Sequence, residues 1–189
     1  MTTLHFTDNA DADALLSENP FALLVGMILD QQIAMEMAFM GPAKIRDRIG
    51  KLDPAAVCAY DPDAFVEVFR QSPAVHRFPG SMAKRVQEVA KAIVDNWSGD
   101  PTTIWTEDAP TGAEILRRLK ALPGFGEQKA KIFLALLGKR LEVDASGWRE
   151  ASAPYGEDGC YRSVADVVDV DSIARVRQTK QAAKAAAKA

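Results

Sequence analysis

Two glycines in one short segment have the type and spacing to bind an anion. The segment is Leu122-Pro123-Gly124-Phe125-Gly126. Glycine puts no side chain in front of the neighbouring backbone N–H groups, and at a helix start these donors stand at the positive end of the helix dipole. Most charged side chains around the segment are basic, although the chain as a whole has a net charge of −3. These basic residues are Arg117, Arg118, Lys120, Lys129, Lys131, Lys139 and Arg140. The patch indicates a polyanionic partner at this place.

Two helices are expected to hold this turn. Leu116, Leu119 and Leu122 recur at helical spacing before it, and apolar residues recur in the same way from Gln128 to Leu137. Pro123 gives up a backbone donor and Gly124 accepts a positive φ, so together they end the first helix. A plain corner between two helices, with solvated lysines, is the alternative interpretation of the same pattern.

A buried helix is predicted after Asn19-Pro20, which pairs a capping side chain with proline at the first helical position. Residues 21–29 are apolar on every side, as in a helix surrounded by core. Asp30, Gln31 and Gln32 then follow abruptly. Unpaired polar groups are costly to bury, so these three side chains must reach solvent, a partner or a ligand.

The rest of the chain indicates an all-α protein, because no run alternates as a strand would. Asp53-Pro54 and Asp61-Pro62 are further capped helix starts, and residues 82–97 form an amphipathic helix. Gly41-Pro42 is expected to break the helical region 33–49. Part of residues 1–18 is interpreted as a short strand or arm, and residues 98–110 as a loop.

We divide the chain into four parts. Residues 1–42 hold an N-terminal segment and the core helix of a first lobe, and residues 43–140 form a helical lobe that ends in the paired helices. Residues 141–171 are a loop-rich segment that returns to the first lobe. Residues 172–189, rich in Ala and Lys, form a basic C-terminal helix or tail.

Composition excludes several other classes of protein. No apolar run approaches the ~20 residues that span a bilayer, and the N-terminus does not have the pattern of a signal peptide. We therefore expect a cytoplasmic protein without a membrane partner. Cys58 and Cys160 are the only cysteines, too few for a four-thiolate iron–sulfur cluster. The only histidines, His5 and His76, complete no zinc-type spacing, so no metal site is expected.

The hairpin segment, followed by Gln128-Lys129-Ala130, resembles the helix-hairpin-helix of the HhH-GPD superfamily of base-excision DNA glycosylases. Asn19 to Gln32 resembles the first long core helix of that family, and His76 to Val86 resembles the helix entry upstream of the hairpin. The resemblance covers roughly residues 19–145. It implies a two-lobed, multi-helix, all-α fold and double-stranded DNA as the partner. We expect a monomer that is associated with the nucleoid.

The resemblance also implies roles for individual residues. Gln31 or Gln32 would fill the gap left by a flipped base, and Asp144 would be the catalytic carboxylate, with Asp30, Asp166 and Asp169 as alternatives. Trp105, Trp148 and Tyr155 are our candidates for the walls of the base pocket, with Trp148 favoured because it shares a loop with Asp144. The hairpin would hold the DNA backbone, with a monovalent cation as a further ligand there. The backbone-binding residues are Leu122, Gly124, Phe125, Gly126, Gln128 and Lys129.

Gln128 departs from the family, because members that also cut the backbone carry a Schiff-base lysine there. An amide cannot form that adduct. Lys129 is rotated by ~100° and is expected to point elsewhere. The interpretation is a monofunctional DNA glycosylase that uses water. The alternatives are a noncatalytic DNA-binding member and a structural protein whose hairpin holds another polyanion or a partner.

Overall fold

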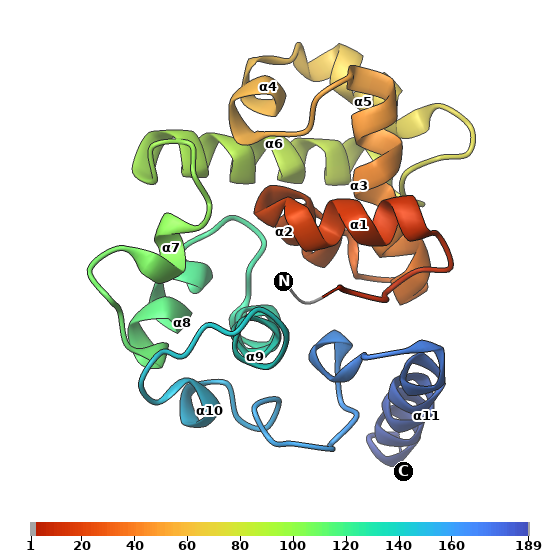
Figure 1. Ribbon diagram of the computed structural model, residues 1–189. Helices are drawn as coiled ribbons and strands as arrows, with labels where there is room; N and C mark the ends of the chain where they lie inside the picture. The colour runs from red at the N-terminus through yellow and green to blue at the C-terminus, as the bar shows by residue number, and fades with distance from the viewer. Residues whose placement is uncertain (1–2, 189) are drawn as a thin grey trace.

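In the computed structural model, which describes residues 3–188, every regular element is helical (Figure 1). The all-α class predicted from the sequence is therefore confirmed. The α-helices are α1 (Ala10–Glu18), α2 (Pro20–Leu29), α3 (Met35–Ile49), α4 (Pro54–Ala59), α5 (Pro62–Arg70), α6 (Pro79–Asn96), α7 (Thr103–Thr106), α8 (Gly112–Lys120), α9 (Glu127–Arg140), α10 (Trp148–Ala151) and α11 (Val170–Ala186). A short 3-10 helix, η1, spans Val164–Asp166.

Helix α2 forms where its cap and its composition predict. The Asn19 side chain accepts a hydrogen bond from the Ala22 N–H, and residues 21–29 are all buried. Asp53 and Asp61 cap α4 and α5 in the same way. Within residues 3–188 no single helix is long and apolar enough to cross a membrane, and α1 and α2 pass that test only as a pair bent by 115°.

The helices pack in two groups around one continuous apolar core. Helices α1 to α6 contact one another, and α7 to α11 form the second group with η1 (Figure 1). This grouping differs from the expected boundaries, because α4 to α6 stay with α2 and α3, while α9 packs with the segment after it. Helix α11 also reaches the first group, since Arg177 pairs with Glu36 and Lys180 lies near Asp30.

Helix α3 runs without a break through Pro42, so the expected interruption at Gly41-Pro42 is wrong. Gly41 is needed for close packing instead. A Cβ there would lie 2.4 Å from the Leu29 Cδ1, so its absence lets α2 and α3 approach. Packing of α2 on α3 compensates for the hydrogen bond that Pro42 removes.

The short strand or arm expected for part of residues 1–18 can apply only before Ala10, because the rest of the segment forms α1. Asn9 caps this helix, and the buried Asp13 carboxylate accepts hydrogen bonds from the N–H groups of Phe6 and Thr7. Asn9 thus caps the helix, and Asp13 ties it to the segment before it. Within the expected loop 98–110, α7 buries Trp105.

The predicted paired helices are α8 and α9, joined by residues 121–126. Leu122 and Phe125 are buried, and the Phe125 ring meets Phe133 of α9 edge-on with 6.0 Å between ring centroids. Gly124 has φ +79°, which favours glycine. The apolar side chains therefore fix the turn and leave both glycines at the surface.

Candidate functional site

The turn between α8 and α9 presents an open helix N-terminus. Gly126 is the N-cap of α9, and no side chain makes a capping hydrogen bond there. A Cβ built on Gly126 would have no neighbour within 4 Å. The first N–H groups of any α-helix have no intrahelical partner, so those of α9 are free to meet an anion.

A cation that the sequence analysis missed lies against this turn. A Cβ on Gly124 would be 2.6 Å from the Arg85 Nη1, so the guanidinium of α6 covers this glycine. Arg85 also pairs with Glu88, with 3.2 Å between Nε and Oε2, and its side chain is 42% exposed. Arg85 belongs to the predicted amphipathic helix, but only the packing of α6 brings it to the hairpin.

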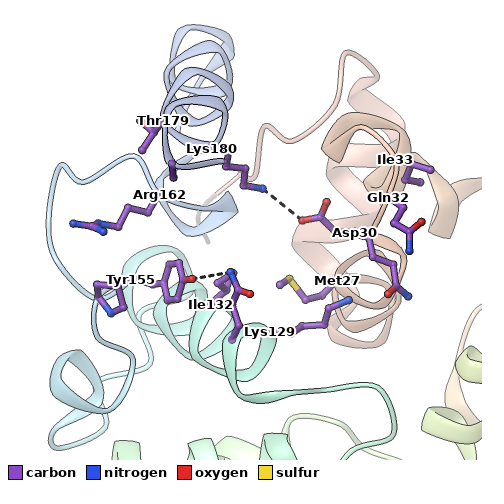
Figure 2. A pocket seen from close by; sticks show the side chains of 14 residues that line it. Met27, Asp30, Gln32, Ile33, Lys129, Ile132, Tyr155, Arg162, Thr179 and Lys180 are labelled. Atoms are coloured by element: carbon purple, nitrogen blue, oxygen red, sulfur yellow. Dashed lines mark hydrogen bonds and ion pairs between the residues drawn. The ribbon is translucent and has the colours of Figure 1, made fainter. Parts of the chain in front are cut away.

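A cavity of about 600 Å³ opens beside the start of α9. Four segments line it: the first two turns of α9, the end of α2 with residues 30–33, the loop between α10 and η1, and α11. Figure 2 shows side chains from these segments converging on one space. The volume lies within the range of ~300–1,000 Å³ that is usual for ligand pockets.

Asp30 is the carboxylate that lines this cavity. It is the C-cap of α2, its side chain is 13% exposed, and its Oδ2 lies 4.0 Å from the Nζ of Lys180 (Figure 2). Burial raises the pKa of Asp30, while the charges of Lys180 and Lys129 act in the opposite direction. Each lysine favours the ionised carboxylate, but burial outweighs them and the pKa of Asp30 stays above its ordinary value.

Lys129 also lines the cavity, so the expectation that it points away from Gln128 is wrong. The first turn of α9 faces the end of α2, and residues on two sides of this turn reach the same space. The Lys129 Nζ donates a hydrogen bond of 3.1 Å to the carbonyl of Ile28. The pKa of this amine is lowered to about 8, chiefly by burial; the charge of Asp30 opposes this shift and that of Arg85 adds to it.

Gln128 and Tyr155 meet across the cavity wall. The Gln128 Nε2 donates a hydrogen bond of 2.9 Å to the Tyr155 hydroxyl, which fixes both side chains (Figure 2). Tyr155 is half-buried, and within residues 3–188 it is the one aromatic residue in the cavity lining.

Gln31 and Gln32 lie exposed at the same cavity, in a turn that His76 holds in place. The Phe78 N–H donates to the His76 Nδ1, so the His76 Nε2 is the donor to the Gln31 carbonyl at 3.0 Å. Burial lowers the pKa of His76, which favours this neutral ring. Gln32 has φ +56°, a conformation with a cost for any residue but glycine.

Neither Asp144 nor Trp148 lines the cavity. Asp144 is exposed in the loop after α9, whereas Trp148 is buried. A Cβ on Gly138 would lie 2.5 Å from the Trp148 ring, and one on Gly112 would lie 2.3 Å from the Trp148 Cα. Trp148 therefore locks α10 onto α8 and α9, a position that does not fit the expected role as a pocket wall.

The other two candidate acids have structural partners. Asp166 forms a buried ion pair with Lys139, with 2.7 Å between Oδ1 and Nζ, and accepts the N–H groups of Arg162 and Ser163. Asp169 caps α11 by accepting from the Ser172 N–H. Among residues 3–188 no group of three His, Cys, Asp or Glu side chains is arranged to hold a metal ion.

Comparison with known proteins gives one match. The family model of the HhH-GPD superfamily base excision DNA repair protein matches residues 25–188, which include the hairpin and every wall of the cavity. No curated protein and no solved structure matches the chain significantly. The match spans most of the chain and agrees with its helical fold and with the open hairpin. The chain therefore belongs to the HhH-GPD superfamily of base excision DNA repair proteins.

Proposed function

We propose that the chain is a monomeric DNA glycosylase that hydrolyses the N-glycosidic bond of a damaged or mispaired base in double-stranded DNA. The observation that carries the proposal is a cavity that extends from the first turn of α9 to the carboxylate of Asp30. A phosphate bound on the α9 amides would leave its neighbouring nucleotide beside this cavity. A base must leave the stack and enter such a pocket before an enzyme can act on it.

The hydrolysis requires a carboxylate near C1′ of the sugar. As the base departs, the sugar develops positive charge, and a fixed negative group stabilises it and can orient a water molecule. We assign this role to Asp30, because it lines the cavity and Asp144 does not. Gln31 and Gln32 are exposed directly after Asp30, and we assign them to fill the gap that the flipped base leaves in the DNA stack.

We propose further that the enzyme uses water and leaves the DNA backbone intact. Gln128 has no amine, and the Lys129 amine donates its hydrogen bond to Ile28. With a pKa of about 8, this amine is mostly protonated at neutral pH, and a protonated amine is not a nucleophile. Borohydride should therefore trap no covalent complex on abasic or damaged DNA. A trapped complex that disappears in Lys129→Gln would contradict this.

The test of the proposal is release of free base. Duplexes with uracil, an alkylated purine, oxidised guanine or adenine mispaired with guanine are incubated with excess protein, and free bases are separated by chromatography. We expect release from at least one duplex, with strand cleavage only after hot alkali. Binding of all four duplexes without release of any base would refute the proposal that the chain is an enzyme.

A noncatalytic DNA-binding protein is the second candidate. Its support is the exposure of Asp144, which occupies nearly the place of the family's catalytic acid but lies outside the cavity. In this case the hairpin would bind DNA phosphates, with an affinity that falls steeply as salt increases, and no base would be released.

A further inference from the structure

The walls of the cavity carry more positive than negative charge. Lys129 comes from α9 and Lys180 from α11, whereas Asp30 is the one acid in the lining among residues 3–188. Arg162, from the loop before η1, also lines the cavity but pairs with Glu157, with 3.9 Å between Nη2 and Oε2. Figure 2 shows the Lys180 amine directed at Asp30, with Lys129 below them on α9. The charges of Lys129 and Lys180 both act on the Asp30 carboxylate, so these three side chains together carry one net positive charge.

The cavity also offers few aromatic faces. Proteins recognise cationic ligands largely by placing them over aromatic rings, where the negative face of the ring attracts the charge. Among the described residues, Tyr155 is the one aromatic residue in the lining, and the Gln128 amide holds its hydroxyl. Trp148, another aromatic residue expected here, is packed against Gly138 instead.

We infer that the cavity takes an uncharged base with carbonyl oxygens, such as a pyrimidine or an oxidised purine, and disfavours N-alkylated purines that carry a positive charge. The inference rests on the proposed glycosylase function and names the substrate class of the same site. Lys129 and Lys180 act on the departing base, while Asp30 acts on the sugar.

Cleavage of the N-glycosidic bond explains why nearby cations favour the release of an uncharged base. When the bond from C1′ to the base nitrogen breaks, both bonding electrons go with the base, which leaves as an anion. Positive groups that are already in place stabilise this developing charge. Water supplies the oxygen that bonds to C1′, and its proton neutralises the released base. A positively charged alkylpurine leaves as a neutral base, so it gains nothing from Lys129 and Lys180 and is repelled by them.

The experiment compares single-turnover base release from duplexes that differ at one nucleotide. Uracil and 8-oxoguanine represent the uncharged class, and 7-methylguanine and 3-methyladenine the cationic class, with each rate divided by its spontaneous rate. We expect at least one uncharged base to exceed both cationic bases by about tenfold or more. In Lys180→Gln its release should slow by at least about tenfold. Lys184→Gln, also on α11 but outside this cavity, should not slow it.

The outcomes separate the inference from the proposed function. Faster normalised release of either cationic base, or an equal effect of Lys180→Gln and Lys184→Gln, would overturn the substrate class and leave the glycosylase proposal standing. Absence of release from every duplex would overturn both. Circular dichroism and duplex binding of each variant identify a loss of release that is caused by misfolding. Lys180→Arg, which keeps the positive charge, should release base faster than Lys180→Gln.

Discussion

Two substitutions in the hairpin should separate stability from DNA binding. Gly124 has φ +79°, and a side chain in this left-handed conformation costs roughly 1–2 kcal/mol. The new Cβ of Gly124→Ala would also lie 2.6 Å from the Arg85 Nη1, but this is the flexible end of a partly exposed side chain and can move at little cost. The free energy of unfolding should therefore fall by roughly 1–2 kcal/mol, and the melting temperature by about 2–8 °C.

Gly126→Ala is the matched variant. Gly126 has φ −66° and ψ 171°, which any residue adopts, and its Cβ would meet nothing within 4 Å. Stability should change by no more than about 1 kcal/mol. The new methyl group stands before the free amides of α9, however. Loss of one hydrogen bond to a charged phosphate is worth roughly 1.5–3 kcal/mol, so duplex binding should weaken by about tenfold to a hundredfold.

Thermal unfolding gives the stability of each variant. Fluorescence anisotropy of a labelled duplex, measured over a series of salt concentrations, gives its affinity for DNA. If Gly126→Ala bound duplex DNA as tightly as the unmodified protein at low salt, the α9 amides would not be the phosphate site. A Gly124→Ala protein as stable as the parent would show that the turn is not held as the structure has it.

Two further predictions concern charged groups. Asp166→Ala should lower the free energy of unfolding in urea by about 3–5 kcal/mol, because it leaves the buried Lys139 without its partner. Asp158→Ala, which removes an exposed partner of Arg149, should cost no more than about 1 kcal/mol, and equal losses would contradict the assignment. Base release should slow as pH rises through about 8, where the folded protein loses the positive charge of Lys129. Lys129→Gln should release base more slowly and lack this alkaline limb; an unchanged limb would assign it to another group.

Local sequence signals were sufficient for much of the fold. Asn19-Pro20 predicted the start of α2, and the LPGFG segment predicted the turn between α8 and α9. Both signals act within a few residues, through a cap or a glycine conformation. The break predicted at Gly41-Pro42 was wrong because local signals do not include packing. Helix α3 continues through Pro42, and Gly41 lets Leu29 approach.

The residues of the cavity were harder to predict, because they come from distant parts of the chain. Asp30 gains its significance from Lys180, which lies 150 positions further on, and no local pattern links the two. Asp144 stands in the motif position, but its exposure is a property of the loop after α9. Trp148 looked like a ligand platform because it follows an irregular segment, whereas two glycines of other helices receive it in the core.

Asp30 is proposed to be the carboxylate that acts on a nucleotide held by the hairpin. The decisive experiment measures single-turnover base release by Asp30→Asn and Asp144→Asn, with duplex binding of each variant measured in parallel. Asp30→Asn should slow base release by about a hundredfold or more while duplex binding persists, and Asp144→Asn should change neither quantity. Loss of release in Asp144→Asn, with normal release in Asp30→Asn, would exclude Asp30 from this role.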